Sequence, residues 1–293
     1  MDGWIDRNEF PFESRYFKVP DGKLHYVDEG AGEHAVVMVH GNPTWCFAFR
    51  HLIKVLSSNF RCIALDHLGF GLSDKPRDGS YLPKSHAANL ELLLDELDIS
   101  SATLIVEDWG GPIGLSYAIK NSDKINSLVL MNTWLWSVKG DPHFERFSGF
   151  MGGALGRFLI KKMNFFARVV VKQAFGDKSK LTPHIHKHYL RPLKDSDDRI
   201  ACSVFPKEII GSSSWLDSLW EQRSMIEDLP TLILWGKKDI AFREKELEVW
   251  RKAMKDTKIH EFEDVGHFVH EELGSSLCTL VQEFIFATRK ECL

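Results

Sequence analysis

The chain has 293 residues, 44% of them hydrophobic and 27% charged, with a formal net charge of −4. This composition is typical of a globular protein with a large core, and it lacks the basic surface that nucleic-acid binding requires. The apolar runs are far shorter than the roughly 20 residues of a membrane span. We therefore expect neither nucleic acid nor a membrane as a partner.

Residues 1–7 are polar and of mixed charge, which predicts that no secretory signal is present. The cysteines are odd in number, scattered, and without CxxC spacing: Cys46, Cys62, Cys202, Cys278 and Cys292. This pattern favours a reducing cytoplasmic location and predicts no zinc site or other metal site.

Short apolar runs bounded by turn residues predict the strands. Two early segments, 16–19 and 24–27, alternate in polarity and predict an antiparallel edge. Later runs are continuously apolar, which suits strands covered on both faces of a mostly parallel sheet. They lie at 35–39, 61–65, 103–106, 127–131, 231–235 and 258–262. Helical patterns lie between them; for example, Leu90, Leu93, Leu94 and Leu97 follow helical spacing. We expect an α/β fold with about eight strands flanked by helices.

Residues 135–225 interrupt this alternation. The stretch is rich in Phe, Trp, Lys and Gly and is too long for a connection within a compact sheet. It is predicted to be a helical cap inserted into a core made of residues 1–134 and 226–293.

The most informative motif is Glu107-Asp108-Trp109-Gly110-Gly111, which follows the predicted strand at 103–106. A strand, a nucleophile and a glycine-rich start of a helix form a nucleophile elbow, but Asp108 stands where most such enzymes carry Ser. Val106 lies two residues before it, where serine hydrolases prefer Gly, so we expect tight packing at this turn. A simpler interpretation makes Asp108 the N-cap of a helix.

An Asp nucleophile changes which carbon atom can be attacked. A Ser that attacked a saturated carbon would leave an ether, which water does not readily cleave. A carboxylate that attacks a saturated carbon leaves an ester, which water can hydrolyse. Asp108 therefore predicts substitution at a saturated carbon followed by ester hydrolysis.

Two further residues are candidates for catalysis. His267 follows the last predicted strand and would take a proton from the hydrolytic water. Asp239 follows the preceding strand and would orient the imidazole and stabilise its charged form. The order nucleophile, acid, base is the order of the α/β hydrolases. A structural histidine and an exposed turn aspartate are the alternatives.

Three motifs carry a resemblance to a known family. Residues 40–45 (HGNPTW), 66–74 (DHLGFGLSD) and the elbow at 108–111 resemble the haloalkane dehalogenases of the α/β-hydrolase superfamily. The resemblance implies hydrolysis of haloalkanes to an alcohol, a halide and a proton through an alkyl-aspartate ester. It also implies that the side chains of Asn42 and Trp109 bind the halide and that their backbone amides form an oxyanion hole.

The resemblance implies a small apolar halogenated substrate, a halide ion and water as partners. Carboxylate, imidazole and N–H donors suffice for this chemistry, so no metal or organic cofactor is expected. The sequence leaves open whether the chain forms a homo-oligomer.

Asn132 narrows the resemblance. Some family members carry a Glu at this position after the sixth strand as the supporting acid, whereas the amide of Asn132 cannot carry the charge. The acid therefore falls to Asp239, as in the third subfamily of haloalkane dehalogenases.

Pocket residues in the cap follow from the resemblance, although ordinary packing explains them equally well. Phe166, Phe205 and Pro206 are expected to face the halide or the pocket, and Phe144 or Phe147 to line a tunnel. Trp134 and Trp136 are expected to border the cavity. Aromatic walls suit an apolar alkyl halide.

Related activities remain as alternatives. Epoxide hydrolases share the Asp nucleophile but usually carry two cap tyrosines that protonate the epoxide oxygen. Residues 135–225 of this chain contain one tyrosine, Tyr189. Fluoroacetate dehalogenases resemble a pattern with Arg after the nucleophile, where this chain has Trp109. Coelenterazine luciferase-type oxygenases resemble the family members whose supporting acid is a Glu after the sixth strand, where this chain has Asn132. Intact candidate catalytic residues argue against a non-catalytic ligand-binding protein.

Overall fold

The computed structural model describes residues 3–289. Its centre is an eight-stranded sheet with the order β1-β2-β4-β3-β5-β6-β7-β8. The strands are β1 (Arg15–Val19), β2 (Gly22–Glu29), β3 (Ala35–Val39), β4 (Arg61–Leu65), β5 (Ala102–Asp108), β6 (Ile125–Thr133), β7 (Thr231–Gly236) and β8 (Thr257–Phe262). β2 pairs antiparallel with both β1 and β4, and the other neighbouring strands pair in parallel. The predicted α/β fold with an antiparallel edge is confirmed.

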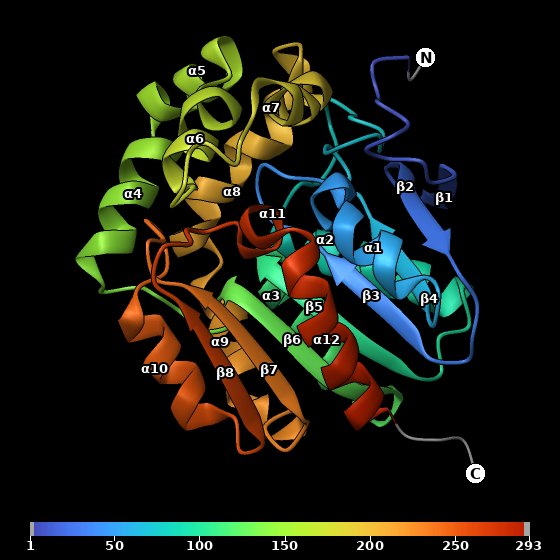
Figure 1. Ribbon diagram of the computed structural model, residues 1–293. Coiled ribbons are helices and arrows are strands. Elements are labelled where there is room, and N and C mark those ends of the chain that lie inside the picture. Colours follow the sequence, from blue (N-terminus) through green and yellow to red (C-terminus); the bar gives the residue numbers. More distant parts are fainter. Residues whose placement is uncertain (1–2, 290–293) are drawn as a thin grey trace.

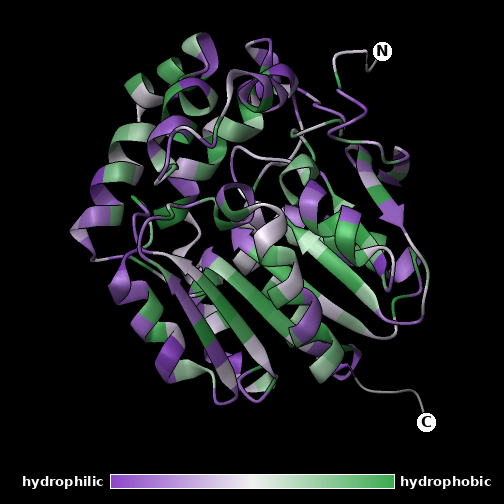
Figure 2. Cartoon of the chain, in the orientation of Figure 1, coloured by the Kyte–Doolittle hydropathy of each residue, from purple (hydrophilic) through white to green (hydrophobic). Residues whose placement is uncertain are grey.

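The central strands are buried on both faces because helices cover each side. In β3, Val37 and Val39 pack into one hydrophobic cluster, while Val36 and Met38 pack into the other. Successive side chains of a strand point to opposite faces, so both clusters receive residues from the same strand. Figure 2 shows β3, β5, β6 and β7 as mainly hydrophobic. β8 differs from the prediction, since it lies at the edge of the sheet and alternates in exposure.

The helices lie on both faces of the sheet and above one edge (Figure 1). Those that pack in the core are α1 (Arg50–Leu56), α2 (Pro83–Glu96), α3 (Gly110–Lys120), α10 (Glu244–Ala253), α11 (Val269–Leu273) and α12 (Ser275–Thr288). Those between β6 and β7 are α4 (Pro142–Gly152), α5 (Ala154–Met163), α6 (Val171–Ala174), α7 (Pro183–Leu190), α8 (Ile200–Gly211) and α9 (Ser213–Glu221). A turn of π-helix, Phe166–Val170, joins α5 to α6.

The inserted helices do not all lie in one place. α4 to α8 lie over the edge of the sheet where β5, β6 and β7 end (Figure 1). α9 instead packs beside α3, and its Leu216 and Leu219 belong to the core cluster on that face of the sheet. The helices that can cover a site at the strand ends are therefore those of residues 142–211.

Four cysteines lie in the part of the chain that the structure describes, and all are buried and unpaired: Cys46, Cys62, Cys202 and Cys278. The fifth, Cys292, lies outside the described residues. Among residues 3–289, no helix is both long enough and apolar enough to cross a membrane.

Candidate active site

The parallel strands end at one edge of the sheet, and the candidate residues meet there. Asp108 is the last residue of β5, and Asn42 follows β3. Asp239 lies after β7, and His267 lies after β8. Parallel strands that point the same way bring residues far apart in sequence to one edge, which is the usual place for ligands in such sheets.

The backbone at Asp108 turns sharply from β5 into α3. Asp108 has a φ of 50°, a conformation that costs a non-glycine residue about 1–3 kcal/mol and is often found at functional sites. The turn requires small neighbours, because a Cβ atom on Gly110 would lie 1.9 Å from the carbonyl oxygen of Val39. The hydroxyl of Thr133 donates to the Asp108 carbonyl at 2.6 Å and ties the elbow to β6.

Val106 packs as the sequence predicts. A Cβ atom on Gly114 in α3 would lie 2.7 Å from Cγ1 of Val106. The glycine that serine hydrolases place before the nucleophile is thus replaced here by Val106, and the close approach of strand and helix is kept by Gly114 on the helix.

Asp108, Asp239 and His267 form a chain of polar contacts. His267 Nδ1 donates to Asp239 Oδ2 at 2.8 Å. Its other nitrogen, Nε2, lies 3.7 Å from Asp108 Oδ2. The carboxyl group of Asp108 is also held by the backbone, since the Asn42 amide donates to Oδ1 at 2.8 Å. These distances suit the predicted roles of a nucleophile, a base and an orienting acid.

Burial shifts the protonation of this group. Burial raises the pKa of Asp108, and the charge of Glu107 adds to that effect against the opposing charge of His267. Burial alone would lower the pKa of His267, but Asp239 and Glu107 reverse this and raise it well above its ordinary value. Charged carboxylates beside a buried imidazole stabilise its protonated form.

Glu107 is a site residue that the sequence analysis missed. Its side chain is 1% exposed, and its Oε1 lies 3.1 Å from His267 Nε2. Its Oε2 accepts from the amide of Gly41 at 3.3 Å. A usable signal was present in the sequence, because two consecutive acids at the end of a buried strand are unusual and must be accommodated without bulk water.

Asn132 supports the acid rather than replacing it. Its Nδ2 donates to Asp239 Oδ2 at 2.7 Å and to the carbonyl oxygen of Gly236 at 3.0 Å. Its Oδ1 accepts from the amide of Gly236 at 2.8 Å. Asp239 also accepts from the amide of Ala241 at 2.7 Å, so both of its oxygens are fixed. Asn132 therefore locks the loop that carries the acid.

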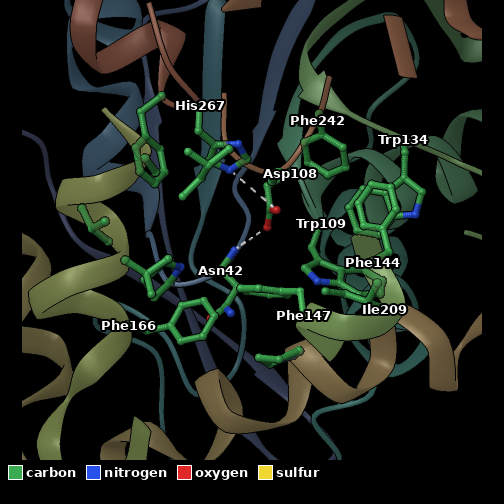
Figure 3. A pocket seen from close by; sticks show the side chains of 18 of the residues that line it. Asn42, Asp108, Trp109, Trp134, Phe144, Phe147, Phe166, Ile209, Phe242 and His267 are labelled. Carbon is green, nitrogen blue, oxygen red and sulfur yellow. Dashed lines mark hydrogen bonds and ion pairs between the residues drawn. The ribbon is translucent and has the colours of Figure 1, made fainter. Parts of the chain in front are cut away.

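A cavity of about 140 Å³ lies between these residues and the inserted helices. Its walls are mostly apolar, and Figure 3 shows Asn42, Trp109 and His267 around Asp108. The lining residues are Asn42, Pro43, Asp108, Trp109, Trp134, His143, Phe144, Phe147, Phe166, Val170, Val171, Ala174, Pro206, Ile209, Ile240, Ala241, Phe242, His267 and Phe268.

Most of the residues expected around the pocket do line it. Phe144, Phe166 and Pro206 are in the wall, together with Phe147 and Trp134. Two expected residues are not.

Phe205 lies outside the wall because its ring is turned into the core, where it packs on Trp109 at 5.3 Å and on Phe70 at 5.4 Å between ring centres. Trp136 packs instead against Trp220 and Trp250. Phe242, Ile209 and Ile240 line the cavity, and nothing in the local pattern of the sequence marked them.

The expected halide donors both face the cavity close to Asp108 (Figure 3). The indole of Trp109 is held edge-on against Trp134, with 4.6 Å between ring centres. The side-chain oxygen of Asn42 is buried and has no hydrogen-bond partner among the described residues. This atom therefore does not tie the Asn42 side chain to another described part of the protein.

A second cluster of polar groups lies away from the cavity, at His25, Cys46 and Asp66. Asp66 Oδ2 lies 2.8 Å from His25 Nδ1 and also accepts from the amide of Leu72 at 2.8 Å. Its Oδ1 accepts from the Cys46 amide at 2.8 Å. Burial raises the pKa of the Cys46 thiol well above its ordinary value. Asp66 connects β2 to the loops at Cys46 and Leu72.

Comparison with known proteins agrees with this geometry. Residues 34–272 match the family described as alpha/beta hydrolase fold. The chain is 32% identical to haloalkane dehalogenase 2 of Mycobacterium tuberculosis, over 97% of this chain and 98% of the relative. It is 33% identical to cis-3-alkyl-4-alkyloxetan-2-one decarboxylase of Shewanella oneidensis, over 95% of this chain and 90% of the relative.

Solved structures share the fold. The haloalkane dehalogenase DatA from Agrobacterium tumefaciens has a TM-score of 0.83 and 23% identity, over 94% of this chain and 97% of that chain. A putative ancestral haloalkane dehalogenase has a TM-score of 0.84 and 23% identity, over 94% of this chain and 99% of that chain. The sheet topology, the elbow and the similarity along almost the whole length place the chain in the alpha/beta hydrolase fold family and, within it, among the haloalkane dehalogenases and their near relatives.

Proposed function

We propose that the protein hydrolyses small haloalkanes through an ester on Asp108. In the first step, Oδ2 of Asp108 attacks the carbon that bears the halogen. The new carbon–oxygen bond forms as the carbon–halogen bond breaks, and the halide leaves with the bonding electrons. The position of Asp108 in the wall of an apolar cavity carries this proposal.

The leaving halide gains charge as its bond to carbon breaks, so N–H donors stabilise the transition state more than the ground state. The indole N–H of Trp109 and the side-chain N–H of Asn42 are placed to provide them, since both residues line the cavity with Asp108. A dry apolar cavity strengthens these interactions.

In the second step, water attacks the ester carbon of Asp108. His267 Nε2 takes a proton from the water, and Asp239 stabilises the resulting imidazolium through Nδ1. The amide of Asn42, which donates to Asp108 Oδ1 at 2.8 Å, holds the oxyanion. The alcohol leaves, Asp108 is regenerated, and one proton is released.

The cavity size favours short substrates. A cavity of about 150 Å³ holds a molecule of the size of benzene. The volume of about 140 Å³ seen here is similar. Bromoalkanes of two to four carbons, such as 1,2-dibromoethane and 1-bromobutane, fit this space.

Epoxide hydrolysis is disfavoured by the position of Tyr189. Opening an epoxide requires an acid at the oxygen. The Tyr189 hydroxyl donates to Glu271 at 2.5 Å, and no tyrosine lines the cavity that the described residues form.

A second candidate follows from the relative in Shewanella oneidensis, whose name states that it decarboxylates cis-3-alkyl-4-alkyloxetan-2-ones. Its identity to this chain is 33%, against 32% for the dehalogenase. The same carboxylate and N–H donors could engage a four-membered lactone. Two alkyl chains, however, require more room than the cavity provides unless they extend through its mouth.

The test combines turnover with trapping of the ester. Halide release is measured over a panel of short bromoalkanes, with styrene oxide hydrolysis and CO₂ release from a cis-dialkyl oxetan-2-one as separate arms. In a His267→Phe variant, intact-protein mass spectrometry should show one alkyl group, located on Asp108 by peptide analysis. No halide release across the panel, or an adduct on another residue, refutes the proposal.

A further inference from the structure

Glu107 is buried in the site, yet the two steps above do not use it. Its carboxylate is 1% exposed and lies beside both His267 and the nucleophile. Isolating a charged carboxylate from water costs several kcal/mol, so such a group is either paired or protonated. The contacts of Glu107 therefore report on where a proton lies in the resting enzyme.

The imidazole of His267 identifies that proton. Nδ1 donates to Asp239, so the remaining nitrogen is Nε2. Nε2 lies 3.1 Å from Glu107 Oε1. At this ion-pair distance the negative charge of Glu107 stabilises a proton on Nε2, although Oε1 accepts no hydrogen bond of good geometry among the described residues.

The other groups around Glu107 cannot supply the balancing positive charge. His40 accepts from the amide of His67 at 3.0 Å through Nε2 and contacts the Gly41 carbonyl through Nδ1, which makes its ring neutral. Burial lowers the pKa of His270, so this ring is neutral too. Tyr189 is bound to Glu271, and burial raises its pKa well above the ordinary value. Asp108 carries the same sign of charge as Glu107. Among these neighbours, His267 is the group that can be cationic.

We propose that Glu107 is a positioning residue that holds a proton on His267 Nε2 in the resting enzyme, so that an imidazolium faces Asp108 and keeps this nucleophile ionised inside the apolar cavity. This inference rests on the proposed function. It assigns opposite effects of Glu107 to the two steps. The imidazolium favours attack by Asp108, but Nε2 must lose its proton to solvent before it can take one from water.

The geometry explains how one residue does both. Asp108 Oδ2 lies 3.7 Å from Nε2, close enough for the imidazolium to stabilise the carboxylate. When Asp108 becomes an ester, one of the carboxylates around the imidazole loses its charge. The proton on Nε2 then becomes easier to remove, although Glu107 still holds it. Glu107 therefore sets the pH at which the ester is hydrolysed.

A Glu107→Gln variant tests the inference by removing the charge with little change in shape. ¹⁵N-histidine NMR follows His267, whose signal is assigned by its loss in His267→Phe. Removing the charge of Glu107 at this distance should lower the pH midpoint of the His267 titration by roughly 1–3 units. The pH limb of ester hydrolysis, measured by mass spectrometry after a single turnover, should move down by the same amount. Alkylation at neutral pH should slow, so less ester accumulates.

Two further variants separate charge from structure. Glu107→Asp keeps the charge and should restore the high pH midpoint of the His267 titration. Glu246→Gln changes a buried carboxylate that pairs with Arg243 and should leave the titration unchanged. A Glu107→Gln variant that folds but titrates like the parent overturns the inference.

If Glu107→Gln does not fold, the ¹⁵N spectrum of the unmodified protein still tests the inference. Its ¹⁵N shifts at neutral pH should be those of an imidazolium, and a neutral His267 ring overturns the inference. The NMR titration does not depend on substrate. Absence of halide release would therefore refute the proposed function while leaving Glu107 testable, and normal halide release with an unshifted titration would refute Glu107 alone.

Discussion

Replacing Asp239 by Asn should separate the two chemical steps. The perturbation removes one negative charge whose oxygen lies 2.8 Å from His267 Nδ1 and keeps the size of the side chain. Attack by Asp108 on the substrate adds no charge to the imidazole, so alkylation should fall by less than hydrolysis, and only because a weaker imidazolium stabilises the Asp108 carboxylate less. Hydrolysis places a positive charge on the imidazole in its transition state, so it should bear most of the loss.

The size of the effect follows from the distance. At an effective dielectric constant of about 20, opposite unit charges about 4 Å apart attract by about 4 kcal/mol. A barrier higher by that amount slows a reaction about 10³-fold. Because Asn132 still holds residue 239 in place, the lost charge accounts for most of the slowing.

Rapid-quench mass spectrometry measures both rates in one experiment. The alkyl-enzyme should form more slowly than in the parent by a smaller factor, and it should then persist about 10³ times longer. Asp264→Asn is the matched control, since its side chain is 88% exposed, pairs with Lys238 and lies three residues before His267. Equal slowing of both steps, or hydrolysis slowed by less than about 10-fold, would refute this account of Asp239.

Two other predictions concern pH and stability. Burial raises the pKa of Asp108, and Asp239 and Glu107 raise the pKa of His267 well above its ordinary value. Attack needs the Asp108 carboxylate, whereas hydrolysis needs neutral His267. The fraction of enzyme held as ester should therefore fall as pH rises, and a fraction independent of pH would contradict this. Glu271→Gln should lower the free energy of unfolding by roughly 3 kcal/mol, because it leaves Arg50, whose side chain is 2% exposed, without its main partner. Urea unfolding checks this against Asp197→Asn, which breaks an exposed pair with Arg77 and should cost less than about 1 kcal/mol; equal losses would refute the role of burial.

Periodicity determined the sheet well because its signal is local. A strand covered on both faces must be apolar along its whole length, and β3 and β4 begin and end where the runs at 35–39 and 61–65 do. The elbow was equally visible, since its positive φ at Asp108 and its glycines are requirements of one short turn. Chain order then placed Asp239 and His267 at the ends of the last two strands.

Side-chain direction and partners could not be obtained in this way. Phe205 and Pro206 are adjacent on α8, yet Pro206 lines the cavity and Phe205 packs on Trp109. Which of two neighbours faces the cavity depends on how α8 is rotated about its axis. That rotation is fixed by packing against residues far away in sequence.

Glu107 shows the same limit in the active site. The sequence determined that a carboxylate precedes Asp108, and it predicted Asp108, His267 and Asp239 as the reacting group and its support. Only the tertiary structure placed Oε1 of Glu107 3.1 Å from His267 Nε2, because the two residues come from the ends of different strands. Charge–charge distances depend on how those strand ends meet, and they decide how strongly a proton is held.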